Sequence, residues 1–387
     1  MVLPVSGRNG GTAAGRHGCR GVKLRIAVCF GGDSSDPGAF SGSPAGLTAA
    51  LERAGHSVLR VNTALPSALE RIAGRARWLH PELCRVHTYI ADARLSKLEY
   101  DAVVQIGTDF LVCTAAPTVT YDDMTVAQHV RLRDDWFARY PRRAQLAWQV
   151  RQMRAFTNAD RCCVLSQWAA ESVVQDYQQP AEKVCVIGLG GNHIIEAPAD
   201  RDWSKPRYLI IAKNWRRKNV PLVVETFAEV KRRFPSASLD VVGPYIGGPQ
   251  PGVVFHGSLD LNKLSDRRRV EELLRSATCY VMPSKHEASA LAFVEAGAAG
   301  IPSIGTTSGG VRELIGPGGT VVDPTDSFSL LREMIRLADP RTASTLGALA
   351  ADHARWYTWD ATAQRLLNVI EEVARGRGRS SNECSTS

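Results

Sequence analysis

Residues 283–300 read PSKHEASALAFVEAGAAG, and they follow the strand-like run Thr278–Met282. The apolar run predicts a short buried strand, and the small and apolar residues after it predict a helix that begins near Ser289 or Ala290. Glu287 then lies in the loop between strand and helix, and Glu295 lies inside the helix. At 1.5 Å per helical residue, roughly 7–9 Å separates the two carboxylates. The two glutamates either lie on the solvent-exposed face of a helix or bind two parts of one ligand.

The same alternation of strand-like and helix-like segments continues on both sides of this stretch, and it predicts an α/β protein with parallel sheets. We expect strands at residues 24–30, 56–61, 100–106, 161–165, 183–187, 208–212, 238–243, 252–256, 278–282 and 301–304, and helices at 47–53, 222–233 and 270–276. The polar segment EAPADRDWSKP at 196–206 interrupts the pattern, and we interpret it as a linker. Two α/β halves joined in this way are expected to form a cleft, because open α/β sheets bind ligands beyond the carboxyl ends of their strands.

The length of 387 residues exceeds one ordinary core, which favours two domains. The first 22 residues are rich in Gly and Arg and lack the apolar stretch of a secretory signal. The predicted divisions are a disordered leader at 1–22, an N-terminal domain at 23–195, the linker at 196–206, a C-terminal domain at 207–355, a terminal helix at 356–375 and a disordered tail at 376–387.

The charge and cysteine content narrows the function classes. The net charge of +8 is modest and is spread over both halves, so a nucleic-acid-binding protein is not indicated and anionic small ligands are. The nine cysteines include no CxxC pair, which favours reduced thiols in a cytoplasmic protein. No apolar run reaches the ~18 residues that span a bilayer. The Arg-rich region 67–97 either contacts the inner face of a membrane peripherally or, as we favour, is a solvated face with Trp78 buried.

A second candidate element, IAKNWRRKN at 211–219, follows the first strand of the second half. Its cations are Lys213, Arg216, Arg217 and Lys218. They lie at the carboxyl end of a strand and therefore face the same sheet edge as Glu287. Cations at that edge can neutralise a leaving diphosphate. The alternative is a solvated basic loop.

Two further features can supply backbone amides to an anion. The helix after Glu287 begins among small residues, so the amides of Ala290 and Leu291 are accessible at a helix N-terminus. The Gly-rich loop FSGSPAG at 40–46, which contains Gly42, follows the first strand of the first half. Such a loop is a weak indication by itself, because surface turns use the same residues.

Three acidic or basic features favour structural roles. Asp200 and Asp202 spell a DxD pattern, but they lie in the predicted linker, and we predict no metal site. Asp123 follows a strand-like run and either faces a second substrate or caps a turn. His286 neighbours Glu287 and is expected to be structural more often than to reach a phosphate.

These motifs together resemble one family, the retaining glycosyltransferases of family 4, or group 1, over roughly residues 23–374. The segment PSKHEASALAFVEAGAAGIPSI at 283–304 is similar to the family's E-x7-E element, SGGVRELI at 308–315 to its gG…E element, NWRRKN at 214–219 to its Lys-Gly element, SGS at 41–43 to its SG[TS] loop, and YTW at 357–359 to the start of its terminal helix. The chain departs from the family in having Asn219 for the usual Gly and EASA for the common EGFG.

The resemblance implies the GT-B fold: two Rossmann-like domains face a central cleft, and a C-terminal helix crosses back to the first domain. It implies a metal-independent hexosyltransferase that needs no cofactor and uses a UDP- or GDP-linked sugar as donor. Glu287 would bind a hydroxyl of the donor sugar, and Lys218, helped by Arg217 or Lys213, would hold the diphosphate. The other positions that the resemblance implies are Glu295 for the ribose, Ala290, Leu291 and Gly42 for the phosphates, and Asp123 near the acceptor.

The acceptor is a carbohydrate, a lipid-linked or a small molecule, and the sequence does not choose among these. The resemblance also leaves two alternatives to glycosyl transfer. One is a GT-B enzyme that epimerises or hydrolyses the sugar nucleotide, and the other is a scaffold protein that binds a nucleotide sugar with weak activity.

Overall fold

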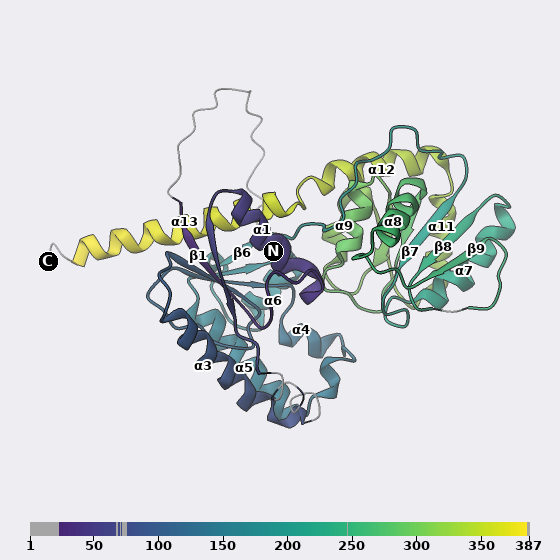
Figure 1. Ribbon diagram of the computed structural model, residues 1–387. Coiled ribbons are helices and arrows are strands. Elements are labelled where there is room, and N and C mark those ends of the chain that lie inside the picture. Colours follow the sequence, from purple (N-terminus) through teal and green to yellow (C-terminus); the bar gives the residue numbers. More distant parts are fainter. Residues whose placement is uncertain (1–22, 67–68, 70, 72–75, 246, 385–387) are drawn as a thin grey trace, which may run out of the picture.

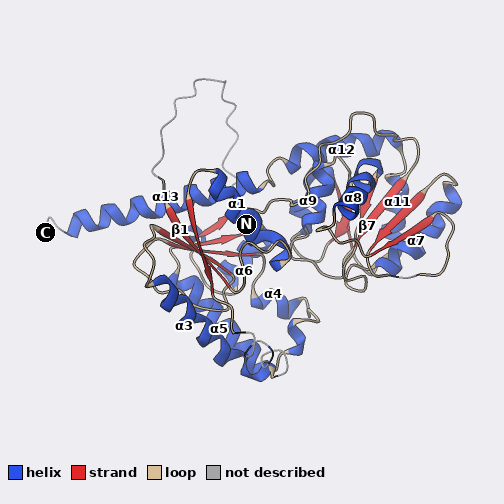
Figure 2. Cartoon of the chain, in the orientation of Figure 1, coloured by secondary structure: helices blue, strands red, loops and turns tan. Residues whose placement is uncertain are grey.

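The computed structural model describes residues 23–66, 69, 71, 76–245 and 247–384. It confirms the α/β prediction, because two separate parallel sheets are each flanked by helices (Figures 1 and 2). The predicted leader at 1–22 lies outside the described residues. Within the described residues, no helix is both long enough and apolar enough to cross a bilayer.

The first domain is built on six parallel strands in the order β2-β1-β3-β4-β5-β6. The strands are β1 (Arg25–Phe30), β2 (Ser57–Asn62), β3 (Ala102–Ile106), β4 (Thr118–Asp122), β5 (Arg161–Val164) and β6 (Val184–Val186). The helices are α1 (Ser43–Arg53), α3 (His80–Leu95), α4 (Val126–Arg131), α5 (Arg142–Asn158) and α6 (Gln167–Gln175). β3 and β4 are buried along their whole length, as expected for central parallel strands covered on both faces.

The second domain repeats this plan with the order β12-β11-β10-β7-β8-β9. Its strands are β7 (Arg207–Ile211), β8 (Ser238–Val242), β9 (Val253–Gly257), β10 (Cys279–Val281), β11 (Ser303–Thr306) and β12 (Gly319–Val322). Its helices are α7 (Val220–Arg233), α8 (Leu264–Ser276), α9 (Leu291–Ala298), α10 (Val311–Ile315), α11 (Ser327–Arg336) and α12 (Pro340–Ala354). Residues 187–206, between the two sheets, contain no helix or strand.

The last helix, α13 (Trp359–Cys384), returns from the second domain to the first and packs on α1 (Figure 1). Arg53 of α1 and Asp360 of α13 form an ion pair of 2.6 Å. Trp359 is buried beneath the crossing, where its ring packs on Gly46 and Gly190 and leaves no room for a Cβ at either position. The helix begins three residues later than predicted and continues past Gly376, where we expected a disordered tail.

The Arg-rich region 67–97 contains α3, but the expected burial of Trp78 is wrong, because 56% of this residue is exposed. Trp78 lies in the turn Arg77–Leu79 that precedes α3 and not on the helix itself. Part of the predicted region, at 67–68, 70 and 72–75, lies outside the described residues.

Candidate functional site

Glu287 lies where we predicted it, in the loop between β10 and α9, and it is buried. Its backbone is fixed by the neighbouring loop, because its amide donates to the carbonyl of Ser308 and its carbonyl accepts from the amide of Gly310. Gly309 forms a parallel bridge with it. The SGG segment therefore positions the glutamate as a short extra strand would.

Two cations hold the Glu287 carboxylate. Arg217 Nη1 lies 2.8 Å from Glu287 Oε2, and Lys218 Nζ forms an ion pair with the same oxygen. Burial alone would raise the pKa of Glu287, but Lys218 and then Arg217 outweigh it and lower the pKa below its usual value. The carboxylate is therefore charged at neutral pH. Among the described residues no hydrogen bond reaches Oε1, so this oxygen remains for a ligand.

Asn219 explains how the basic loop is held. It adopts a left-handed conformation with φ 61° and forms the N-cap position of α7. Its side-chain amide donates to the carbonyl of Pro324 at 2.7 Å and to that of Pro283 at 3.2 Å. Asparagine tolerates this conformation better than other non-glycine residues. Asparagine in place of the family's glycine thus keeps the left-handed backbone conformation and adds two hydrogen bonds to backbone carbonyls.

The role of Asn219 can be tested by two substitutions. Asn219→Gly keeps the backbone conformation but loses both hydrogen bonds, at about 1 kcal/mol each. Asn219→Ala loses the same bonds and adds about 1–2 kcal/mol of left-handed strain. We therefore expect both variants to melt below the wild type and the alanine variant to melt lowest, as measured by thermal unfolding. Equal melting temperatures for the two variants would contradict the strain argument.

Glu295 lies inside α9, as predicted, but it faces the segment between the domains. Its Oε1 accepts hydrogen bonds from the backbone amides of Asn192 at 3.1 Å and His193 at 3.0 Å. Burial raises the pKa of Glu295, and the two amides oppose that shift. One carboxylate oxygen therefore joins the second domain to the segment between the domains.

Asn192 is a junction between several elements that no sequence pattern predicts. Its side-chain nitrogen donates to the carbonyl of Ser41 at 2.7 Å, and its side-chain oxygen accepts from the Trp359 indole at 2.9 Å. Ser41 and the following Gly42 both have positive φ, 57° and 80°. Gly42 is buried at the N-cap position of α1. Asn192 thus fixes the glycine loop of the first domain against both the crossing helix and the second domain.

The loop between the two glutamates does not need the glycines that the family commonly has there. None of Ala288, Ser289 and Ala290 has a positive φ. Ala288 and Ala290 are buried, and Ala290 is the N-cap of α9 with an extended backbone. The amides of Ala290 and Leu291 lie at the start of this helix. Of the remaining predicted residues, Lys213 is exposed, and the ion pairs of Glu287 among the described residues are with Arg217 and Lys218 and not with Lys213.

Glu313, which was predicted only as part of the SGGVRELI motif, makes a close contact between the domains in this region. Its carboxylate accepts from the amides of Gln167 at 2.6 Å and Trp168 at 2.8 Å, at the N-terminus of α6 in the first domain. A carboxylate at a helix N-terminus satisfies otherwise unpaired amides. Burial raises the pKa of Glu313, and these two amides oppose that shift.

His286 also crosses the cleft. Its Nε2 lies 3.5 Å from Asp134 Oδ1, and Asp134 Oδ2 lies 2.8 Å from Nδ1 of His129 in the first domain. Burial would raise the pKa of Asp134, but contacts with His129 and His286 lower it below its usual value. The structural role that we favoured for His286 is therefore a contact between domains.

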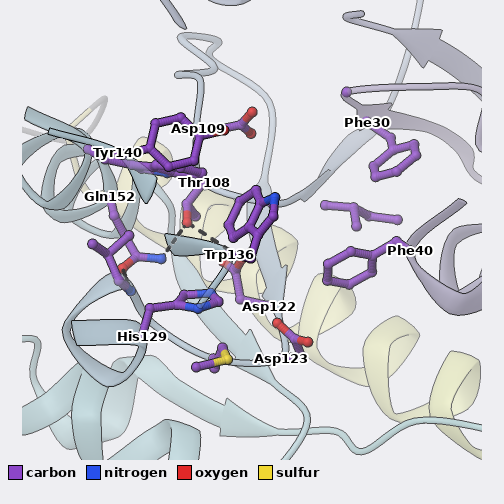
Figure 3. Close-up of a pocket in the computed structure, with 16 residues that line it drawn as sticks. Phe30, Phe40, Thr108, Asp109, Asp122, Asp123, His129, Trp136, Tyr140 and Gln152 are labelled. Carbon is purple, nitrogen blue, oxygen red and sulfur yellow. Dashed lines mark hydrogen bonds between the residues drawn. The ribbon is translucent and has the colours of Figure 1, made fainter. Parts of the chain in front are cut away.

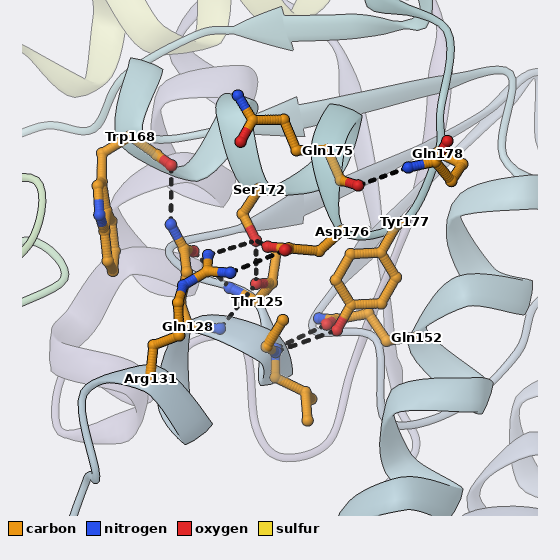
Figure 4. Close-up of polar contacts among 12 residues, drawn as sticks. Thr125, Gln128, Arg131, Gln152, Trp168, Ser172, Gln175, Asp176, Tyr177 and Gln178 are labelled. Atoms are coloured by element: carbon orange, nitrogen blue, oxygen red, sulfur yellow. Dashed lines mark hydrogen bonds and ion pairs between the residues drawn. The ribbon is translucent and has the colours of Figure 1, made fainter.

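The helix that holds His129 is only six residues long, and polar contacts with α5 and α6 position it (Figure 4). Thr125 caps it and also contacts Ser172 at 2.6 Å, and Gln128 donates to the Trp168 carbonyl at 2.7 Å. Gln152 accepts from the amide of Val126 at 2.7 Å. These buried contacts fix the helix on the face of the first domain that is turned to the cleft.

A pocket of about 390 Å³ opens beside His129, at the carboxyl ends of β1, β3 and β4 (Figure 3). Asp123, the predicted acceptor-side residue, lines it together with Asp109 and Asp122. Burial, and then repulsion from Asp123 and Asp109, raises the pKa of Asp122 well above its usual value. Burial also raises the pKa of Asp123, against the opposing effect of His129.

The raised pKa of Asp122 predicts a pH-dependent stability. The unfolded chain loses this proton near pH 4, below the pH at which the folded protein loses it, so stability falls as pH rises above that value. Asp122→Asn cannot ionise. We expect its melting temperature to exceed that of the wild type at about pH 8 and the difference to shrink towards about pH 4. The exposed Asp352→Asn is the control, and a difference that does not vary with pH would contradict the argument.

Residues of the DxD pattern make hydrogen bonds within the protein. Asp202 accepts hydrogen bonds from Ser204, and Arg201 between the two aspartates is buried, where it donates to backbone carbonyls of Leu274, Ala277 and Ala299. Within the described part of the chain, no group of three or more His, Cys, Asp or Glu side chains is arranged to hold a metal ion.

Comparison with known proteins agrees with this geometry. Residues 205–339 match the family model described as "Glycosyl transferases group 1". The chain is 28% identical over 249 residues to the D-inositol 3-phosphate glycosyltransferase of Streptomyces bingchenggensis, an alignment that covers 57% of this chain and 54% of that protein. It is 27% identical over 194 residues to a GDP-mannose-dependent alpha-(1-6)-phosphatidylinositol monomannoside mannosyltransferase of Mycolicibacterium smegmatis, covering 44% and 49%. The chain thus spans about half the length of these relatives.

Solved structures share the whole fold. Sucrose-phosphate synthase from Thermosynechococcus elongatus superposes with a TM-score of 0.68 at 19% identity, over 92% of this chain and all of that one. WaaG, a glycosyltransferase involved in lipopolysaccharide biosynthesis, gives 0.61 at 17% identity over 89% and 99%. The chain therefore has the GT-B fold, and residues 205–339 of its second domain match the model of the group 1 glycosyltransferases.

Proposed function

We propose that the protein is a retaining glycosyltransferase that moves a hexose from a UDP- or GDP-linked sugar to a hydroxyl group of an acceptor. The observation that carries this proposal is the position of Glu287. A charged, buried carboxylate with one free oxygen lies beside two cations at the carboxyl edge of the second sheet. That edge faces the pocket of the first domain, which supplies room for the acceptor.

In the proposed complex, Glu287 Oε1 accepts a hydrogen bond from a hydroxyl of the donor sugar. Lys218 and Arg217 each retain further N–H donors for the diphosphate. The exposed side chain of Lys213 can move to contact the same diphosphate. Charge-assisted contacts of this kind stabilise the developing charge of the leaving group. The proposal assigns charge neutralisation to the chain itself, so transfer should persist when divalent metals are chelated.

The remaining predicted residues complete the donor site. The amides of Ala290 and Leu291 lie at the N-terminus of α9, where the helix dipole favours a phosphate. Gly42 brings the backbone of the first domain to the same cleft, and Glu295 retains Oε2 for a ribose hydroxyl. Each assignment can be tested by its effect on the affinity for the nucleoside diphosphate alone.

The proposed reaction breaks the bond between the anomeric carbon and the diphosphate oxygen and forms a bond from the same face to the acceptor oxygen. The acceptor proton passes to the departing phosphate. The protein then contributes electrostatic stabilisation and positioning, and it contributes no side-chain nucleophile.

The proposal is tested by incubating the full chain with a panel of UDP- and GDP-sugars, GDP-mannose included because one relative is named for it, with and without cell extract as a source of acceptors. Transfer predicts release of the nucleoside diphosphate that depends on extract. Release that yields the free sugar would indicate a hydrolase, and an altered sugar nucleotide would indicate an epimerase. Binding without release would favour a scaffold.

We also propose a peripheral contact with anionic membranes. It is supported by the surface of α5, where the apolar side chains of Leu146, Val150 and Met153 are exposed. Arg142, Arg143 and Arg154 are exposed on the same helix. Basic and apolar side chains on one helix surface suit the interface of an anionic bilayer. Co-sedimentation with anionic but not with neutral vesicles would support the contact.

A further inference from the structure

The pocket of the first domain has an unusual charge for a site beside an anionic donor. Sixteen residues line this pocket, among them Asp109, Asp122 and Asp123. Three of them are aspartates, and none is a lysine or an arginine. The only basic residue among these sixteen is His129, whose Nδ1 already contacts Asp134. The pocket is therefore acidic.

Asp122 is the clearest indication that the acidic pocket is built for a ligand. The residue is 6% exposed, and its Oδ2 has no hydrogen-bond partner among the described residues. Its other oxygen contacts Thr108 at a long 3.5 Å. A buried carboxylate oxygen without a donor is costly, and such an atom in a native structure requires an explanation. An ammonium group that arrives with a ligand provides the donor and stabilises the charged form of Asp122, whose pKa is raised by burial and then by Asp123 and Asp109 in the free protein.

The other two aspartates have basic residues near them. Asp109 is influenced by His87 and Arg151, and both lower its pKa against the larger effect of burial. Neither basic residue lines the pocket, so their effect on Asp109 does not come from the pocket side. Asp123 is influenced by His129 from the pocket side and by Glu287 across the cleft. The groups that act on the pKa of Asp122 are Asp123, Asp109 and Thr108, and none of these is a cation.

The walls of the pocket are aromatic. Phe30 and Phe40 form one side, with ring centroids 6.4 Å apart, and Trp136 and Tyr140 lie across from them (Figure 3). Trp136 and Trp148 pack edge to face at 5.7 Å. Aromatic faces attract cations and cover the C–H faces of small rings. Three carboxyl groups with aromatic rings around them together favour a positively charged, hydroxylated ring.

The pocket adjoins the proposed donor site, because one chain of side chains links the two. His129 lines the pocket and contacts Asp134, which in turn contacts His286 next to Glu287. A ligand in the pocket therefore lies on the acceptor side of the cleft.

We propose that this pocket binds the acceptor and selects one that carries an amine, such as an amino sugar or an aminocyclitol, and excludes phosphorylated rings. The proposal rests on the function proposed above for the same cleft. The ammonium group lies against Asp122 and Asp109, and a hydroxyl of the same ring is turned towards the donor. A phosphate group in this position would meet three carboxylates. The chain thus differs in substrate class from its relative that is named for D-inositol 3-phosphate.

The test compares three six-membered rings that differ in charge: 2-deoxystreptamine, which carries two amines, myo-inositol, and myo-inositol 1-phosphate. Each is titrated into the full chain, with binding measured by isothermal calorimetry or ligand-observed NMR. We expect the diamine to bind at least about tenfold more tightly than myo-inositol and the phosphate to bind most weakly, since a charge-assisted contact adds about 1.5–3 kcal/mol. Equal binding of the diamine and the phosphate, or no binding of any ring, would overturn the proposal.

Two variants connect the preference to the pocket. Asp122→Asn is nearly isosteric, and it should lower affinity for the diamine at least about tenfold without affecting myo-inositol. Trp136→Ala changes a half-exposed side chain and should weaken both rings. Asp352→Asn, on the surface of the second domain, should change neither, and melting temperatures show which variants are folded. Unchanged diamine affinity in folded Asp122→Asn would count against the proposal.

These titrations contain no donor, so they separate this proposal from the previous one. If the protein binds the diamine through Asp122 but releases no nucleoside diphosphate, the proposal of an acidic pocket stands and glycosyl transfer is refuted. If it releases the diphosphate with extract but does not distinguish the three rings, glycosyl transfer stands and the proposed preference for an amine is refuted.

Discussion

Glu287→Gln is expected to lower the rate of nucleoside diphosphate release by about 10²–10³-fold at saturating donor, the range that follows loss of one preorganised electrostatic contact. The substitution keeps the shape of the side chain and removes its charge. Lys218 and Arg217 then lose their shared anion, and they can no longer be held in one geometry by Oε2. The sugar hydroxyl also loses a charged acceptor. Both effects act at the reacting end of the donor.

The control for this prediction is Glu225→Gln, which changes an exposed glutamate on α7 of the same domain. It should leave the rate unchanged. The Glu287 variant should remain folded, with a melting temperature that shifts by the equivalent of about 1–3 kcal/mol for the disturbed buried pair. If the folded variant retains more than about a third of the wild-type rate, Glu287 is not at the reacting centre.

The positions of the two glutamates could be predicted because they depend on local sequence. A strand of apolar residues, a loop of small residues and a helix follow directly from the pattern at 278–298, and the structure places Glu287 in the loop and Glu295 in the helix. The parallel sheets follow from the same alternation. Helix ends were less accurate: α9 begins at Leu291, one or two residues later than expected.

The contacts across the cleft could not be predicted, because they join residues that are far apart in the chain. Nothing near Glu313 in the sequence indicates that it caps a helix of the other domain, 146 positions away from Gln167. Asp134 and His286 likewise meet only after the two domains dock. The burial of Trp78 was mistaken for a related reason, since a single aromatic residue in a turn has no periodicity that fixes its direction.

Asn219 shows how a departure from a family pattern can preserve the structure. In the sequence, the loss of a glycine weakens the case for an active donor site. The structure shows that asparagine adopts the left-handed conformation and binds two loops that flank the site. These two hydrogen bonds could not be predicted from the sequence, because their acceptors are backbone carbonyls, which every residue has.

Gly309→Ala is expected to disrupt the same site from its backbone side. Gly309 has φ of 111°, and a Cβ at this position would overlap the carbonyl oxygen of Glu287. An alanine with this positive φ is strained by about 1–3 kcal/mol, and the clash adds about 1–3 kcal/mol. We therefore expect the free energy of unfolding to fall by about 2–5 kcal/mol. Glu287 can escape the clash only by moving away from Lys218 and Arg217, so we also expect nucleoside diphosphate release to fall by at least about tenfold.

Two glycines separate the causes of that effect. Gly55 has a φ of 94°, but a Cβ added there would meet no atom within 4 Å beyond its chain neighbours, so Gly55→Ala measures backbone strain without a clash. Gly248 has neither a positive φ nor such a neighbour within 4 Å, so Gly248→Ala should change nothing. Melting temperatures should therefore fall in the order Gly248→Ala, Gly55→Ala, Gly309→Ala, and only the last should lose activity. If Gly309→Ala matches Gly55→Ala in both measurements, the bridge between Gly309 and Glu287 does not position the glutamate, and the SGG segment has another role.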